Sequence, residues 1–180
     1  MRVIGIDPGT RHLGWGVVDV VGPRVTHVAH GVIHTVEGSP LADRLVVIDD
    51  ELDEVVRAHA PVEAAVESIF FSKDAQAAAK LGHARGVVLL HLCRAGLTVA
   101  EYAPAHVKRA IVGGGRADKH QVAMVIKALL RLAAPPPSDA ADALAIAITH
   151  GRTTRLPALL EARRTGASDA TLRLTPRARS

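Results

Sequence analysis

Aromatic side chains are scarce in this sequence: its 180 residues include two Phe, one Tyr and one Trp. The hydrophobic content of 48% is nevertheless typical of a packed globular protein. The core must therefore consist mainly of aliphatic side chains. Each aromatic residue can be examined separately for a functional role.

Cysteine and long apolar runs are also scarce. Cys93 is the single cysteine, which excludes an internal disulfide and fits a reducing compartment. Its place in an apolar helical stretch predicts a packing role. No run of about 18 apolar residues is present, and the charge at position 7 comes too early for a signal peptide. We therefore expect a soluble, cytoplasmic protein.

Charge of each sign is unevenly distributed along the chain. The formal net charge is +4, but residues 152–180 alone carry seven Arg against two acids. Residues 40–67 have two basic and eight acidic side chains, whereas residues 68–131 have ten basic and three acidic ones. Weak periodicity in the last segment predicts one domain over residues 1–151, followed by a basic, largely disordered tail over 152–180. This segregation of positive charge favours a nucleic-acid partner.

Three extended segments open the chain. Residues 2–7 are mostly apolar and end at an Asp-Pro-Gly turn, and Val-rich segments follow at about 13–20 and 24–35. Three strands in quick succession predict an antiparallel meander. Three histidines in the third strand suggest a metal site, but strict alternation would place His27 and His30 on opposite faces, which argues against it.

The rest of the chain alternates helices and strands, which predicts an α/β fold. Ser138 is the expected N-cap of the last helix, which should end at about His150. The expected elements are a helix over about 41–56, a strand at 62–67, an Ala-rich helix at 73–95, a strand at 97–102, a short helix opened by Pro104, a helix from about Asp118 to 132, and the last helix.

Four carboxylates stand at the ends of these elements. Asp7 and Glu67 end two predicted strands, and Asp139 and Asp142 share one face of the first turn of the last helix. Each has an ordinary explanation when taken alone, such as favourable charge at a helix N-terminus. Gathered at one sheet edge, however, they would repel one another unless a cation lay among them. The pattern therefore predicts a site for Mg²⁺, which prefers oxygen ligands.

Four motifs carry a family resemblance: Gly5-Ile6-Asp7-Pro8-Gly9-Thr10, and the segments 66–71, 80–86 and 139–145. In this order and spacing they resemble RuvC-type Holliday junction resolvases of the RNase H-like superfamily, over about residues 1–151. The resemblance implies an α/β, RNase H-like fold with a five-stranded mixed sheet, whose first three strands are antiparallel, flanked by helices. It also implies that the metal ligands and catalytic residues are Asp7, Glu67, Asp139 and Asp142.

The resemblance extends to activity and partners. It implies a homodimer that binds four-way junction DNA and nicks two opposing strands symmetrically, in homologous recombination and DNA repair. It implies two Mg²⁺ ions in each active site, with Mn²⁺ as a substitute. A branch-migration complex of the RuvA and RuvB type is the expected protein partner.

Further residues acquire roles through the same resemblance. Phe70 and Phe71 are adjacent, so their rings should point in opposite directions; we expect Phe70 to stack on a DNA base and Phe71 to lie in the core. Ala78, Gly82 and Gly86 make one side of their helix slim, which favours a two-fold dimer contact there. The expected phosphate contacts are Lys108, Lys119, Arg116 and Lys73.

Three alternatives remain open at this stage. An ATP-binding protein of the actin and sugar-kinase group shares the opening Gly-Ile-Asp-x-Gly-Thr pattern, but it needs a second lobe that this chain is too short to contain. A small RNase H-like family that acts on ribosomal RNA precursors is a nearer relative. A junction-binding scaffold without nuclease activity is the non-enzymatic alternative, and the four intact acids argue against it.

Overall fold

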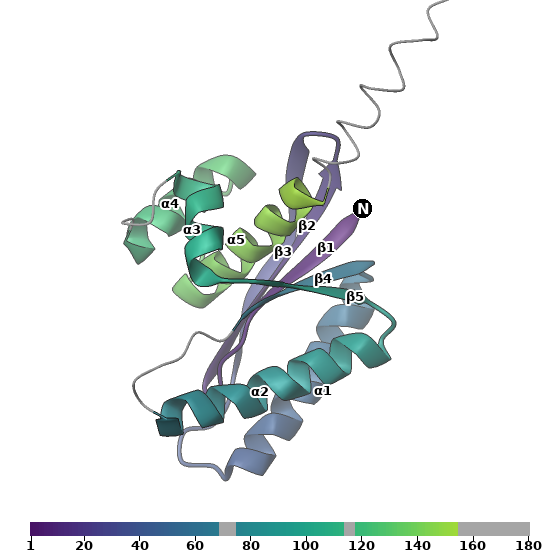
Figure 1. The fold of residues 1–180 in the computed structure, drawn as a ribbon, viewed down its shortest axis with the longest axis vertical. Helices are drawn as coiled ribbons and strands as arrows, with labels where there is room; N and C mark the ends of the chain where they lie inside the picture. Colours follow the sequence, from purple (N-terminus) through teal and green to yellow (C-terminus); the bar gives the residue numbers. More distant parts are fainter. Residues whose placement is uncertain (69–74, 114–117, 155–180) are drawn as a thin grey trace, which may run out of the picture.

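A mixed five-stranded sheet forms the centre of the computed structural model, which describes residues 1–68, 75–113 and 118–154 (Figure 1). The strand order is β3-β2-β1-β4-β5. Strands β1 to β3 pair antiparallel, whereas β4 and β5 run parallel to β1. The predicted sheet is thus confirmed. Its strands are β1 (Arg2–Asp7), β2 (His12–Val21), β3 (Arg24–His34), β4 (Glu63–Glu67) and β5 (Thr98–Tyr102).

Helices cover both faces of the sheet in two layers (Figure 1). Each layer buries its own aliphatic cluster against the sheet. No Phe, Tyr or Trp belongs to the fully buried core of the described residues, as the scarcity of aromatics suggests. One layer contains α1 (Leu41–His59) and α2 (Ala75–Arg94), and the other contains α3 (Pro104–Val112), α4 (Lys119–Leu130) and α5 (Ser138–Thr153).

Helix α5 lies directly on the backbones of β1 and β2, and glycines make this possible. A Cβ atom at Gly5 would overlap the carbonyl oxygen of Ala143, and one at Gly14 would overlap that of Asp139. Backbone atoms cannot move aside by changing rotamer, so larger residues would push the helix away. This close approach sets the position of the first turn of α5 against the end of β1.

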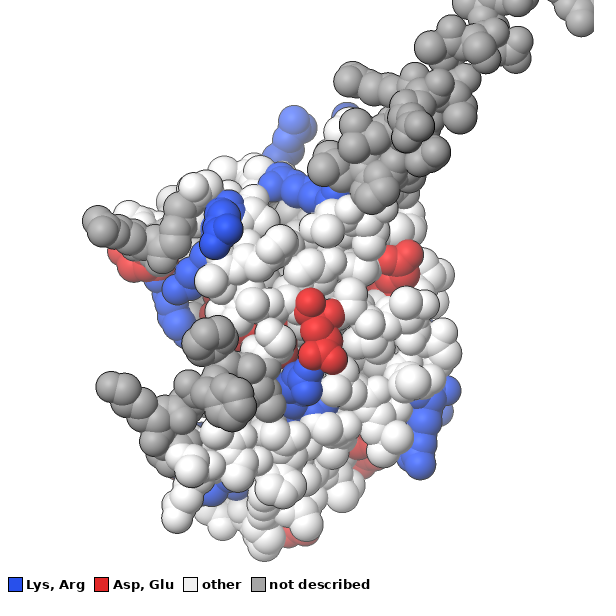
Figure 2. All heavy atoms as spheres, in the orientation of Figure 1, with Lys and Arg blue, Asp and Glu red and all other residues white. Residues whose placement is uncertain are grey.

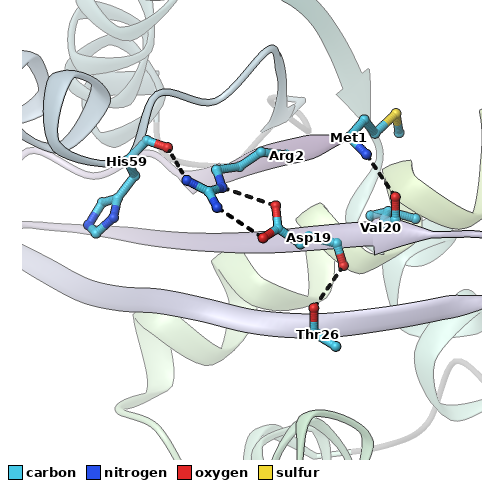
Figure 3. A network of polar contacts seen from close by, with 6 residues as sticks. All are labelled: Met1, Arg2, Asp19, Val20, Thr26 and His59. Carbon is cyan, nitrogen blue, oxygen red and sulfur yellow. Dashed lines mark hydrogen bonds and ion pairs between the residues drawn. The ribbon is translucent and has the colours of Figure 1, made fainter.

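The start of β1 is held by a polar network (Figure 3). The Arg2 guanidinium donates two hydrogen bonds of 3.0 Å to the carboxylate of Asp19 on β2, and a third of 2.9 Å to the carbonyl oxygen of His59 at the end of α1. The bond to Arg2 lowers the pKa of Asp19. The network fixes β1 at the end opposite to Asp7.

The prediction that His27 and His30 face opposite sides of the sheet is wrong. A β-bulge opposite Val17 and Val18 inserts one residue into β3, so His27 pairs with Val18 and His30 with Gly16. Both rings then lie on the α5 side, with 2.8 Å between His27 Nε2 and His30 Nδ1. Among the described residues no group of three His, Cys, Asp or Glu forms a ready-made metal site, there or elsewhere.

Two local predictions also fail. Ser138 is the first residue of α5 rather than its N-cap; Pro137 occupies that position, and its carbonyl accepts from the Ala141 N–H. The helix then continues beyond His150 to Thr153. Cys93 is exposed rather than packed, because α2 buries the stripe that contains Val88 and Leu92, and Cys93 lies one position beyond it.

No helix in the described part of the chain combines the length and the apolar character that crossing a membrane requires.

Candidate active site

The fold brings the predicted acids to one edge of the sheet. Strands β1 and β4 are parallel neighbours, so Asp7 and Glu67 both lie at their carboxyl ends. The close packing of α5 on β1 and β2 places Asp139 and Asp142 beside them. Three elements from distant parts of the sequence therefore supply the four carboxylates.

A cleft of about 270 Å³ opens at this edge. Asp7, Glu67 and Asp142 line it from the sheet and α5. Lys108 of α3 and Lys119 of α4 line the opposite side, and Lys119 Nζ lies 3.6 Å from an oxygen of Asp142. Asp139 is not part of the lining, but its charge acts on both aspartates that are.

The carboxylates strongly perturb one another. Burial raises the pKa of Asp7 to about 8, with further contributions from the charges of Glu67, Asp142 and Asp139. Burial also raises the pKa of Glu67 and of Asp142, while the ammonium of Lys119 opposes the rise in all three. Perturbed acids in a cleft are a mark of functional sites.

The donor set fits a hard divalent cation. Carboxylate oxygens from separate elements are what Mg²⁺ and Mn²⁺ prefer, and a cation between them would offset both the burial and the repulsion that raise the pKa of Asp7. Three of the four acids line the same cleft, but no three His, Cys, Asp or Glu side chains among the described residues are already arranged as a complete set of metal ligands. Asp7 and Glu67 are nonetheless close enough for each to affect the pKa of the other.

Arg85 of α2 binds the backbone of Glu67 at the end of β4. Its Nε donates to the Glu67 carbonyl oxygen at 3.2 Å, and its guanidinium forms an ion pair with Glu101 of β5. The Arg85 side chain is only 17% exposed. Its place is thus to hold the ends of β4 and β5 together, and the sequence showed it only as one charge of a basic stretch.

Phe70, Phe71, Lys73 and Arg116 lie outside the described residues, as does the segment 155–180 that makes up most of the predicted tail.

The residues predicted for a dimer contact lie on α2. Ala78 and Gly82 are half-buried and Gly86 is exposed, and no atom within 4 Å would meet a Cβ at Gly86.

Sequence reasoning missed the glycines that position α5. Gly14 and Gly16 alternate in β2, so both face the same helix, and Gly5 of β1 pairs with Gly16. Alternating glycines in a Val-rich strand were the available signal, because glycine in a strand often marks a close backbone approach.

Comparison with known proteins identifies the family. The profile described as "Crossover junction endodeoxyribonuclease RuvC" matches residues 3–150. The chain belongs to the RuvC family. A RuvC of Sorangium cellulosum is 67% identical over 150 residues, which cover 83% of this chain and 84% of that protein. A RuvC of Afipia carboxidovorans is 51% identical over 160 residues, which cover 89% and 94%.

Solved structures agree with this RuvC assignment. The structure titled "T. thermophilus RuvC in complex with Holliday junction substrate" is similar with a TM-score of 0.81 and 40% identity, over 87% of this chain and 96% of that one. The yeast mitochondrial Holliday junction resolvase Ydc2 matches with a TM-score of 0.63 at 14% identity, over 91% and 83%. The latter likeness concerns the fold alone.

Proposed function

We propose that this RuvC family member is a structure-specific endonuclease that resolves four-way DNA junctions by paired, symmetric nicks in recombination and repair. The observation that carries the proposal is the convergence of Asp7, Glu67 and Asp142 in one cleft opposite Lys108 and Lys119. Buried acids beside lysines combine a cation site with contacts for a phosphate. This combination suits metal-assisted hydrolysis of a phosphodiester.

The acids would hold divalent ions, Mg²⁺ or Mn²⁺ and two in number. When bound, such ions supply activation of the attacking water and stabilisation of the leaving oxygen. Asp7 and Glu67 stand on adjacent strand ends and Asp142 on a helix seated on the sheet, so the ligands have fixed backbones. Asp139, outside the lining, adds negative charge that favours a cation.

The two lysines would bind the DNA backbone at the cleft. Lys108 is half-buried on α3, and Lys119 is exposed on the first turn of α4. An Asp118–Gln121 capping box fixes that turn. Phosphate contacts of this kind position the substrate without reading its sequence. Phe70, Lys73 and Arg116, outside the described residues, are proposed to extend this DNA contact.

Symmetric nicking requires two active sites, so we propose a homodimer. Gly86 supports a two-fold contact through α2, because open space surrounds it and it would let another backbone approach closely. Ala78 and Gly82 precede it at i, i+4 and i+8 spacing on the same helix face. A RuvA- and RuvB-type branch-migration complex is the proposed assembly partner.

A nicking assay on a synthetic four-way junction tests the proposal. The wild-type chain should cut opposing strands of the junction in the presence of Mg²⁺. It should not cut a linear duplex, and it should not cut the junction when EDTA replaces Mg²⁺. Asp7→Asn should retain junction binding but lose cleavage, since it removes the charge that holds the metal without emptying space. Asp50→Asn, on the exposed side of α1, is the matched control.

Junction binding without cleavage by the wild type would leave the scaffold alternative standing. Cleavage by Asp7→Asn within tenfold of the wild type would show that the metal ligands lie elsewhere.

A further inference from the structure

A second concave site lies at the other end of the α3–α5 layer. It is a cavity of about 840 Å³ between the β2–β3 hairpin and the ends of α4 and α5. Arg24 comes from the hairpin, Arg131 from the end of α4 and Arg152 from the last turn of α5. No Asp or Glu of the described residues lines it. Three cations thus converge from three distant segments of the chain.

These arginines are available for a ligand. All three are exposed, and none forms an ion pair with another described residue. Arg152 donates one long bond of 3.3 Å to the Ala110 carbonyl oxygen. On the face drawn in Figure 2, Lys and Arg side chains at the upper end have no Asp or Glu beside them, whereas those lower on this face lie among acidic side chains.

Arg131 adopts a backbone conformation that ordinary side chains avoid. It is the C-cap of α4, with φ of 55° and ψ of 42° in the left-handed region, and the Leu132 N–H bonds back to the Lys127 carbonyl oxygen. Glycine is the usual residue at such a position. Ala60 at the end of α1 adopts a similar conformation, but Arg131 also lines the cavity, so this position places a charged residue at the cavity.

We infer that this cavity is a second DNA-backbone site, which holds phosphates of the duplex beyond the one being cut. The inference rests on the proposed function, because it takes the substrate to be DNA. Guanidinium groups match the geometry of phosphate oxygens and form bidentate hydrogen bonds with them. A cavity with positive charge on several sides therefore suits a phosphodiester better than a single lysine would.

The position of the cavity fits one arm of the substrate. Helices α4 and α5 both lead from the acidic cleft to the basic cavity: Lys119 and Asp142 line the first, and Arg131 and Arg152 the second. At 1.5 Å of rise per residue, Asp142 and Arg152 are about 15 Å apart. This distance corresponds to roughly four base pairs of duplex.

The test uses the full-length protein with Arg24→Gln, Arg131→Gly and their combination. Arg131→Gly removes the charge and relieves the left-handed conformation, so its melting temperature, followed by Trp15 fluorescence, should be no lower than that of the wild type. A control that carries Arg57→Gln and Arg94→Gln removes the same charge from the α1–α2 layer.

Junction affinity is measured in EDTA at several salt concentrations. Each cavity substitution should weaken binding about five- to tenfold and should reduce the magnitude of the slope of log K against log salt by about one. The control should change neither the affinity nor this slope. In Mg²⁺, the cavity variants should show a raised KM with kcat unchanged. Methylphosphonates placed about four base pairs from the cleaved bond remove phosphate charge from the junction. Compared with the unmodified junction, this modified junction should bind the wild type more weakly, whereas the double variant should bind both junctions equally well.

Unchanged affinity and salt slope in the double variant would overturn the inference and leave an acidic peptide as the candidate occupant. Equal losses in the control and the cavity variants would also overturn it, since the effect would then be one of net charge. Absence of cleavage by the wild type would instead refute the proposed function. Cleavage by the wild type together with an unaltered KM in the cavity variants would refute only the proposed role of the cavity in DNA binding.

Discussion

Removal of the Asp7 charge should stabilise the metal-free protein at alkaline pH, although it is expected to abolish DNA cleavage. Burial and the neighbouring acids raise the pKa of Asp7 to about 8, from 3.8 in the unfolded chain. Between these two values the folded protein keeps a proton that the unfolded chain has lost. Stability therefore falls as pH rises through this window, and Asp7→Asn escapes the loss.

The magnitude follows from the width of the window. Each pH unit costs about 1.4 kcal/mol while the difference of one bound proton persists. Between pH 5.5 and 8 the wild type should lose roughly 3 kcal/mol relative to Asp7→Asn, part of which belongs to the coupled titration of Glu67. At about 2 to 4 °C per kcal/mol, the two melting temperatures should diverge by roughly 6 to 12 °C.

Thermal melts in EDTA, followed by Trp15 fluorescence across this pH range, measure the effect. Added Mg²⁺ should then stabilise the wild type by about 2.7 kcal/mol at a concentration of one hundred times its dissociation constant, and should leave Asp7→Asn largely unaffected. A difference between the two melting temperatures that stays the same at every pH would refute the argument that the acids form one repulsive cluster. Equal stabilisation of both proteins by Mg²⁺ would refute it as well.

Four further predictions address the supports of the site and the residues outside the described ranges. Gly14→Ala should destabilise the protein by about 1 to 3 kcal/mol in urea melts and lose cleavage because it forces α5 off the sheet. His150→Ala should cost roughly 2 to 4 kcal/mol of stability, and its effect should be non-additive with that of Glu63→Gln, because the two side chains share a hydrogen bond of 2.6 Å. Phe70→Ala should cost about 1 to 3 kcal/mol in junction cleavage with an unchanged melting temperature, whereas Phe71→Ala should lower stability by about 3 to 5 kcal/mol; the reverse pattern would exchange their roles. Truncation after Thr154 should lower the salt dependence of DNA binding and leave cleavage intact, so an inactive or unfolded product would show that the domain extends further.

The parts of the fold that depend on local patterns could be predicted from the sequence. The Asp-Pro-Gly turn marks the end of β1, and the helical spacing of Leu41, Ile48 and Leu52 marks α1. Asp118 was recognisable as a helix start because its capping box is a local motif. The four acids stood out for the same reason, since each follows or opens a predictable element.

The features that escaped prediction depend on how distant segments meet. The bulge that turns His27 and His30 to one face becomes apparent only when β3 is paired with β2. The basic cavity joins Arg24 to Arg131 and Arg152, which no sequence window contains. The start of α5 was misjudged by one residue because the extended Pro137 takes the N-cap position that a serine would normally favour.

Helix α5 explains how the protein tolerates so much like charge at one point. Repulsion from Asp7 and Glu67 should push the first turn of this helix outward, whereas the helix dipole favours Asp139 there by only about 0.3 to 1 kcal/mol. Most of the opposing force must therefore come from packing along the rest of the helix.

The far end of α5 is held by the buried His150. Its ring bonds to Glu63 of β4 at 2.6 Å and to the Tyr102 hydroxyl of β5 at 2.9 Å, and its side chain is 3% exposed. With Ala143 and Ala147 seated on Gly5, the helix cannot slide or tilt without breaking these bonds. The carboxylates are thus held close together before a cation arrives. Below about pH 8 the metal-free protein relieves part of their repulsion by keeping a proton on Asp7, and a bound divalent cation would displace that proton.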